Sequence, residues 1–256
     1  MIDTHTHLLY FENRDEIIKN MQTDNLSQIV NIGTTLEDSK QGIALANNYD
    51  NVWTTVGLYP EYADTISDDD LIELEEIAKD KKVVAIGEIG LDYHTEGYNA
   101  KRQKEIFVKQ LEIADRLGLP FCIHCRSAVE DLYEILKENQ NLINHSGLMH
   151  CYSEGKEWVQ KFLDLNLYIS FSGNITFKKN DRSFLKDIPL DRILVETDAP
   201  YLSPEPLRGT QNEPKNVNLV AKKIAETIGI DFEEFDKITT KNAKNFYFKI
   251  KNSEKE

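Results

Sequence analysis

The stretch AIGEIGLD, residues 85–92, indicates both the fold of this chain and the place where its polar chemistry is concentrated. A short apolar run ends there in Glu88, which has a glycine close on each side, and such a run predicts a buried strand. An ionised glutamate on a buried strand is costly unless it pairs with a cation or binds a metal, and the glycines leave room for a ligand. A plain salt bridge and a carboxylate that bridges two cations are both open interpretations.

A helix and then another strand follow this stretch. Apolar side chains recur at helical spacing over residues 101–117, Gly118 stands where a helix stops, and Pro120 opens the next apolar run. This alternation of strand and helix occurs eight times. Strands are predicted from residue 2 and over 28–32, 52–57, 82–88, 120–125, 147–151, 167–171 and 192–198. The clearest helices are predicted over 71–79, 101–117, 129–137, 156–165, 218–228 and 232–248.

Eight such units fit two α/β architectures, a closed (β/α)8 barrel and a doubly wound open sheet. Polar residues favour the barrel, because they gather at the ends of the first, fourth, fifth, sixth and eighth predicted strands. A barrel points all these ends at one axis, whereas an open sheet spreads them along a line. We therefore predict a TIM barrel that forms a single domain over residues 1–250, with a charged, frayed tail at 251–256.

The composition is that of a globular protein. Of the 256 residues 40% are hydrophobic, and no apolar run approaches the ~18 residues that cross a bilayer. Residues 1–5 contain neither a basic nor an apolar targeting region, so we expect a cytoplasmic protein with no membrane partner. Three cysteines form no even disulfide framework, which fits a reducing compartment. We further expect a monomer with no obligate protein partner.

The formal charge of −14 argues against a protein that coats nucleic acid with a basic surface, since that affinity comes from Lys and Arg. The charge argues less against a nuclease, because bound divalent cations supply positive charge where the phosphate must lie.

His5 and His7 are two residues apart on the first predicted strand. Side chains at this spacing project from the same face, so both imidazoles are directed at one point. Neutral imidazole is a favoured ligand of zinc and similar cations. Two surface histidines that share a strand by chance are the alternative. Asp3 lies on the same face and is expected to support or orient the pair.

The fifth predicted strand carries Cys122, His124, Cys125 and Arg126. Residues three apart on a strand point to opposite faces, so the two thiols cannot hold one ion and are interpreted as packing residues. His124 and Arg126 share a face, which places an imidazole beside a guanidinium suited to a phosphate or a carboxylate. A structural ion pair is the alternative for Arg126.

His150 ends the sixth predicted strand, and Glu196 and Asp198 share a face at the end of the eighth. Each of these alone is typical of a buried polar group that has found a partner. Several at equivalent strand ends instead form a mixed cluster of imidazoles and carboxylates, which favours a metal site. The predicted metal ligands are His5, His7, Glu88, His124, His150 and Asp198.

In order and spacing, these segments resemble the TatD-type metal-dependent deoxyribonuclease family, within the amidohydrolase-like barrels. The resemblance covers nearly the whole chain and lies in 3–8 (DTHTHL), 86–93 (IGEIGLDY), 124–126 (HCR), 150–153 (HCYS), 195–202 (VETDAPYL) and the later loop 208–214 (RGTQNEP). It implies a (β/α)8 fold, two divalent cations and hydrolysis of phosphodiesters in DNA. Removal of nucleotides from the 3′ end is one way in which the family cleaves DNA.

The resemblance also implies roles for individual residues. One metal would be held by His5, His7, Glu88 and Asp198, and the other by Glu88, His124 and His150, so that Glu88 bridges. Asp198 would accept a proton from the attacking water as the catalytic base. Arg126, Tyr59 and Arg208 are the predicted substrate-binding residues. Mixed ligands of this kind accept zinc, magnesium, manganese or nickel, which leaves the identity of the metal open.

One position departs from the family pattern. Where the family often has Gly-x-His-Pro, this chain has Gly57, Leu58, Tyr59 and Pro60. Tyr59 can donate a hydrogen bond to a phosphate but is not a comparable base at neutral pH. His94 lies in the same loop layer and either compensates or is simply exposed.

The alternative function is a metal-dependent amide or ester hydrolase on the same barrel, such as a D-aminoacyl-tRNA deacylase. Basic or amide-rich loops around the metals favour a phosphodiester, and a closed, partly apolar pocket favours an amide or ester. Lys178, Lys179, Arg208 and Asn212 are the loop residues that favour phosphate.

Overall fold

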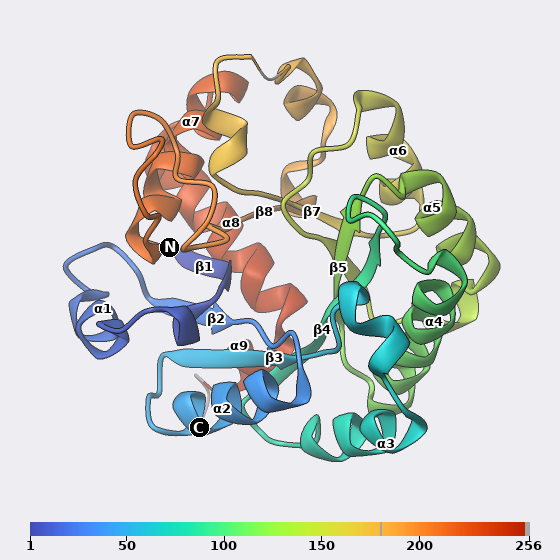
Figure 1. Ribbon diagram of the computed structural model, residues 1–256. Coiled ribbons are helices and arrows are strands. Elements are labelled where there is room, and N and C mark those ends of the chain that lie inside the picture. The colour runs from blue at the N-terminus through green and yellow to red at the C-terminus, as the bar shows by residue number, and fades with distance from the viewer. Residues whose placement is uncertain (180, 254–256) are drawn as a thin grey trace.

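The eight predicted strands form one parallel sheet in chain order. The computed structural model describes residues 1–179 and 181–253, and in it each strand pairs with the next one along the chain. The strands stand at the centre and the helices surround them (Figure 1). The strands are β1 (Ile2–Thr6), β2 (Gln28–Asn31), β3 (Val52–Val56), β4 (Val83–Asp92), β5 (Phe121–Arg126), β6 (Gly147–Met149), β7 (Tyr168–Phe171) and β8 (Ile193–Val195).

The sheet closes where the end of β1 meets the segment after β8. The amide of Asp198 donates to the carbonyl of His5 at 2.9 Å, and the amide of His7 donates to the carbonyl of Ala199 at 2.8 Å. Beneath these bonds the buried carboxylate of Asp3 accepts from the amide of Thr197 at 2.9 Å and from its hydroxyl at 2.6 Å. The predicted barrel is confirmed, and the support expected from Asp3 acts by holding the backbone next to Asp198.

Buried side chains from all eight strands fill the inside of the barrel. Such side chains can meet in one cluster only around the barrel axis. Phe246, Tyr247 and Ile250 belong to the same cluster, so the last two helices cover the amino end of the barrel. The carboxyl end is therefore the end at which a ligand can enter. The strand residues of this cluster include Ile2, Val30, Trp53, Val84, Cys122, Leu148, Tyr168 and Leu194.

Local residues define the ends of some of the helices. Ser67 opens one of them with a capping box to Asp70, and Gly118 ends another in the left-handed conformation, with φ of 64°. No helix in the described part of the chain combines the length and the apolar character that a bilayer span requires. The helices are α1 (Arg14–Asn20), α2 (Leu36–Asn47), α3 (Asp68–Ile77), α4 (Ala100–Leu117), α5 (Val129–Glu138), α6 (Lys156–Asp164), α7 (Val217–Ile228), α8 (Phe232–Phe246) and α9 (Phe248–Ser253).

The connection from β7 to β8 lacks the α-helix that an eightfold strand-helix pattern predicts. Its described residues form only 3-10 turns, η4 (Gly173–Thr176), η5 (Ser183–Asp187) and η6 (Leu190–Arg192). The guanidinium of Arg182 donates to the carbonyls of Ile175 and Phe177, which a continuous helix would instead pair with its own amides. Helix α7 packs against η4 and η5.

Two predicted strands are too long. β6 ends at Met149 and β8 at Val195, so His150 and Asp198 lie in the turns that follow these strands. Beyond these ends the backbone turns into the left-handed region, with φ of 45° at Cys151 and 55° at Asp198, so the regular strand does not continue although single backbone bonds do. At the other end of the chain α9 continues to Ser253, and residues 254–256 of the predicted tail lie outside the described residues.

Candidate metal centre

All six predicted metal ligands converge at the carboxyl end of the barrel. Strand alternation brings His124 there, because it follows the inward-facing Cys122 by two residues. His150 follows the inward-facing Leu148 in the same way although it lies just past the end of β6, since its amide still donates to the carbonyl of Ile123 at 3.1 Å. The potential ligand atoms lie within 4.8 Å of one another in three overlapping groups. The groups are His5, His7 and Glu88; Glu88, His124 and His150; and His5, His150 and Asp198.

The first strand reaches this site through an irregularity. Ile2 belongs to the interior cluster, yet His5, three residues further on, also faces inward. The register of β1 against β2 shifts between Asp3 and Thr6, and an extra residue of this kind turns the side chains that follow. His5 and His7 both reach the site as predicted, with ring centroids 5.4 Å apart.

Glu88 lies at the centre of the cluster. Its Oε1 is 2.8 Å from both His124 Nδ1 and His150 Nε2, and its Oε2 is 3.5 Å from His5 Nε2. Burial alone would raise the pKa of Glu88, but His150 and His124 outweigh it and hold the pKa well below its ordinary value. The site is therefore built around a buried, ionised carboxylate that faces three imidazoles.

His5 shows most directly that a cation fits here. Its ring is fully buried, and neither ring nitrogen has a hydrogen-bond partner among the described residues. Burial, followed by the charge of His150, lowers the pKa of His5 and favours the neutral imidazole. Its Nε2 lies 3.5 Å from Glu88 Oε2 and 3.6 Å from Asp198 Oδ1, a donor set of the kind that binds divalent transition metals.

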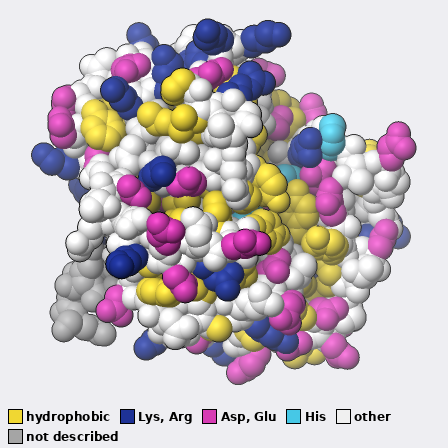
Figure 2. Space-filling view, turned by 60° about the vertical axis from the view of Figure 1, so that its left-hand side comes forward, with side chains coloured by type: hydrophobic (Ala, Val, Ile, Leu, Met, Phe, Trp, Pro, Cys, Tyr) yellow, Lys and Arg dark blue, Asp and Glu magenta, His cyan; other side chains and the backbone are white. Residues whose placement is uncertain are grey.

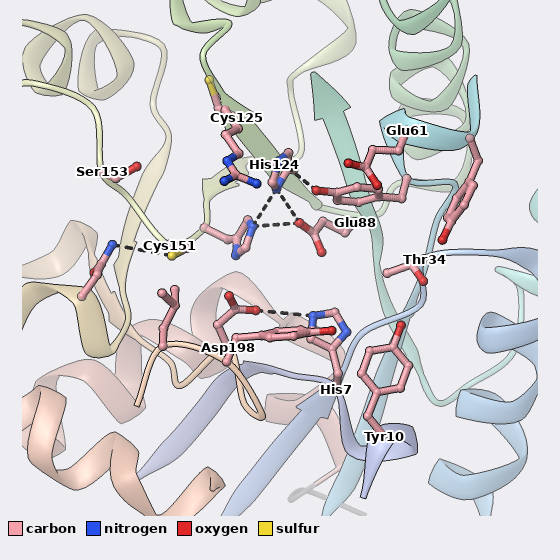
Figure 3. Close-up of a pocket in the computed structure, with 17 residues that line it drawn as sticks. His7, Tyr10, Thr34, Glu61, Glu88, His124, Cys125, Cys151, Ser153 and Asp198 are labelled. Atoms are coloured by element: carbon pink, nitrogen blue, oxygen red, sulfur yellow. Dashed lines mark hydrogen bonds and ion pairs between the residues drawn. The ribbon is translucent and has the colours of Figure 1, made fainter. Parts of the chain in front are cut away.

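Asp198 faces His7, with Oδ1 3.4 Å from His7 Nε2 (Figure 3). Burial alone would raise the pKa of Asp198, but the hydrogen bond with His7 and the positive charge shared by the histidine cluster hold the pKa below its ordinary value. The carboxylate is therefore ionised at neutral pH and chemically able to accept a proton.

Two further carboxylates, for which sequence reasoning proposed no role, support the histidines. Asp92 Oδ2 is 3.0 Å from His124 Nε2, and Glu196 Oε1 is 3.3 Å from His150 Nδ1. In each imidazole one nitrogen faces a supporting carboxylate while the other faces Glu88, an arrangement that fixes the tautomer and orientation of a ligand. Two features of the sequence could have identified these carboxylates. Glu196 shares a predicted strand face with Asp198, and Asp92 ends the stretch that contains Glu88.

Tyr59, the residue that departs from the family pattern, lies within this supporting layer. Its hydroxyl donates to Asp92 Oδ2 at 3.2 Å and lies 3.0 Å from His124 Nε2. Burial and the charges of Glu88 and Asp92 raise the pKa of Tyr59, so the phenol stays protonated. Tyr59 is thus a hydrogen-bond donor beside the cluster and does not act as a base at neutral pH.

A cavity of about 570 Å³ lies over the cluster, and Tyr59 and Arg126 both line it. Arg126 is exposed and makes no ion pair with any described carboxylate, which disfavours the structural alternative. Arg208 is not brought to the lining; its guanidinium lies over the ring of Phe177, 4.3 Å from the centroid. Lys178 and Lys179 lie outside the lining as well.

Two other residues considered from the sequence also lie outside the cavity. Asn212 is buried and donates to the carbonyls of Thr197 and Tyr201, so it shapes the loop after β8. His94 is exposed.

The thiols of β5 lie in different surroundings, as the strand alternation predicts. Cys122 is in the interior cluster with its Sγ 3.2 Å from the hydroxyl of Tyr247, whereas Cys125 lines the cavity. Cys125 also packs against the hydrophobic core, as predicted. Cys151 also lines the cavity, and its Sγ lies 3.0 Å from Ser172 Oγ.

Known proteins match this chain over nearly its whole length. Residues 2–248 match the family described as TatD related DNase. The chain is 38% identical over 252 residues to the uncharacterized metal-dependent hydrolase YabD of Bacillus subtilis strain 168, a match that covers 96% of this chain and 98% of that protein. It is 31% identical over 243 residues to the 3′-5′ ssDNA/RNA exonuclease TatD of Cronobacter sakazakii, with 92% of each covered.

A solved structure agrees with these sequence matches. YJJV, a TatD homologue from Escherichia coli K12, has a TM-score of 0.90 at 27% identity, and the match covers 96% of this chain and 97% of that one. With the family match spanning the barrel and the six converging donors, the chain belongs to the family of TatD-related DNases and is one of its metal-dependent hydrolases.

Proposed function

We propose that this chain is a two-metal phosphodiesterase that removes nucleotides from the 3′ end of single-stranded DNA. The observation that carries the proposal is the pair of donor groups that share Glu88, one with His5 and His7 and the other with His124 and His150. The name of the Cronobacter sakazakii relative, a 3′-5′ ssDNA/RNA exonuclease, supports the choice of substrate and polarity.

Each donor group has the composition of a divalent cation site. In this proposal Asp198 joins His5, His7 and Glu88 around one cation, while His124, His150 and Glu88 hold the other. Imidazole and carboxylate ligands suit zinc, manganese, magnesium and nickel. Two such cations would supply positive charge to the phosphate oxygens and acidify a water molecule.

The side chains of the site have three further roles: proton transfer, phosphate binding and orientation of the histidines. Asp198, held ionised by the histidine cluster, accepts the proton of the attacking water. Arg126 is the only Lys or Arg side chain among the described residues of the lining, and it binds a phosphate oxygen. Asp92 and Glu196 keep His124 and His150 oriented towards Glu88.

The alternative, an amide or ester hydrolase such as a D-aminoacyl-tRNA deacylase, would use the same donors. The observation in its favour is the partly apolar lining, in which Tyr10, Tyr59, Tyr62, Tyr201 and Leu202 form much of the wall. Such a wall would also fit an acyl side chain.

The test compares three substrates with metal-reconstituted protein: a single-stranded DNA oligonucleotide labelled at its 5′ end, the matching RNA and a D-aminoacyl-tRNA. The proposal predicts a ladder of DNA products shortened one nucleotide at a time from the 3′ end. If the DNA remained intact while the acyl ester was cleaved, the amide or ester hydrolase would replace the phosphodiesterase as the proposed function.

A variant tests the assigned base. Asp198→Asn should lower turnover by about 10²- to 10⁴-fold, the range of general base catalysis. The metal content of the variant, measured by atomic emission, separates loss of the base from loss of a ligand. Full activity of the variant with metal bound would remove Asp198 from the role of base.

A further inference from the structure

Three exposed tyrosines stand at the mouth of the cavity. Tyr10, Tyr62 and Tyr201 line it, yet they are 46%, 47% and 52% exposed. They come from distant parts of the chain: η1 (Leu8–Tyr10) after β1, η2 (Pro60–Thr65) after β3, and the loop after β8. In Figure 2 hydrophobic side chains, among which tyrosines are counted, lie beside visible histidines on this face. Several aromatic rings are thus left open to solvent beside the metal centre.

Two of these rings form a corner next to a candidate ligand. The ring of Tyr10 is stacked on that of His7, with centroids 5.3 Å apart and planes at 9°. The ring of Tyr201 is nearly perpendicular to both, at 72° to His7 and 80° to Tyr10, with its centroid 6.5 Å from that of Tyr10. A planar group that stacks on one of these tyrosines therefore presents its edge to the other.

The charged residues of the lining indicate where in the cavity a phosphate would bind. Glu61 lies on the lining next to Tyr62, whereas Arg126 lies at the end of β5. Figure 3 shows Tyr10 beside His7 and across the cavity from Ser153 and Cys151. A phosphate is attracted by Arg126, whereas Tyr10 and Tyr201 offer uncharged rings to the cavity, so their corner suits an uncharged aromatic group.

We propose that Tyr10 and Tyr201 bind, by stacking, the nucleobase of the 3′-terminal nucleotide, next to the bond to be cleaved. This inference rests on the proposed function, because it places the phosphate at the donor cluster. In a nucleotide a single sugar separates the phosphate from the base. The rings of Tyr10 and Tyr201 both contact His7, a candidate metal ligand. A phosphate bound at the donor cluster therefore leaves its base within reach of these two rings. Stacking accepts every base but requires one that is present and unpaired. The enzyme should therefore tolerate sequence and reject abasic ends.

The experiment uses two single-stranded DNA oligonucleotides that differ only in the 3′-terminal nucleotide, which either has its base or is abasic. With metal-loaded wild-type protein, we expect KM for cleavage and Kd by fluorescence anisotropy to be about 5- to 150-fold higher for the abasic end. Tyr10→Leu and Tyr201→Leu should reduce this ratio towards one, whereas Tyr201→Phe, which retains an aromatic ring, should preserve it.

The matched control is Tyr98→Leu. Tyr98 is 45% exposed and stacked on Tyr93, but it lies outside the cavity, so this variant should keep the wild-type ratio. Equal KM and Kd for the two ends in wild-type protein, or an unchanged ratio in both leucine variants with normal metal content, would overturn the base-binding inference and leave the phosphodiesterase proposal standing. If neither oligonucleotide were cleaved but binding still depended on the terminal base, the result would overturn the proposed function and support the stacking site.

Discussion

The substitution His5→Leu separates what the metal centre needs from what the fold needs. His5 is fully buried, its lowered pKa favours the neutral ring, and neither of its nitrogens has a hydrogen-bond partner among the described residues. Leucine fills a similar volume without burying a polar atom. We therefore expect the metal-free variant to be more stable than the metal-free wild type.

The size of the effect follows from two opposing contributions. A buried polar group without a partner costs about 1–3 kcal/mol, and this cost disappears in the variant. The stacked contact with His150, at 4.0 Å and 7°, also disappears, which costs about 0.5–1.5 kcal/mol. The net gain in the free energy of unfolding should be about 1 kcal/mol, or roughly 2–4 °C in Tm.

The assay is urea denaturation in the presence of a chelator and again in the presence of manganese or zinc. Saturating metal at 100 times its Kd should stabilise the wild type by about 2.7 kcal/mol, and the variant by much less because it lacks one ligand. His145→Leu is the control, since His145 is 41% exposed and its Nε2 is 3.8 Å from Asp115; its changes should stay within about 0.5 kcal/mol.

The reasoning would be refuted by either of two results. A metal-free His5→Leu variant that is several kcal/mol less stable would show that His5 serves the fold. Equal stabilisation of variant and wild type by metal would show that His5 is not a ligand.

Three further predictions concern the residues around the donors. Glu196→Gln removes the negative charge beside His150 Nδ1, so metal affinity should fall about 10- to 100-fold in a chelator competition, whereas the exposed Glu226→Gln should leave it unchanged. Tyr59→Phe removes the hydroxyl between Asp92 and His124 and should lower metal affinity or turnover about tenfold; wild-type values would show that the hydroxyl is dispensable. In metal-free protein, burial alone would lower the pKa of His150, but Glu88 and Glu196 raise it well above 6.5. A raised histidine pKa contributes stability that is present below the unfolded pKa and lost as pH rises through the folded pKa. The free energy of unfolding with chelator should therefore fall as the pH rises above 6.5, and a flat profile would contradict this.

Local patterns were sufficient to predict the barrel and its polar end. Whether a side chain faces inward depends on the two-residue period of a strand, so His124 could be placed from its own segment. The ends of helices follow from neighbouring residues in the same way, as at Gly118. The missing helix between β7 and β8 was not predicted, because it depends on how Arg182 binds the carbonyls of a turn.

The supporting residues could not be identified in this way. Asp92 and Glu196 matter because each faces one nitrogen of an imidazole whose other nitrogen faces Glu88. The orientation of a ring depends on everything packed around it, and a sequence pattern contains no such information. Arg208 shows the opposite error, because it was predicted to bind substrate from its place in a family-like loop and does not line the cavity.

By itself the sequence determined which side chains are available as metal ligands and that they lie towards the carboxyl ends of strands in one barrel, because burial and alternation are local properties. Only the tertiary structure decided which of them meet. Asp3 and Thr197 are 194 positions apart, and their hydrogen bonds, made when the barrel closes, place Asp198 beside His5 and His7. The exposed corner of Tyr10 and Tyr201 has the same origin, since its two rings come from opposite ends of the chain and become neighbours only after closure.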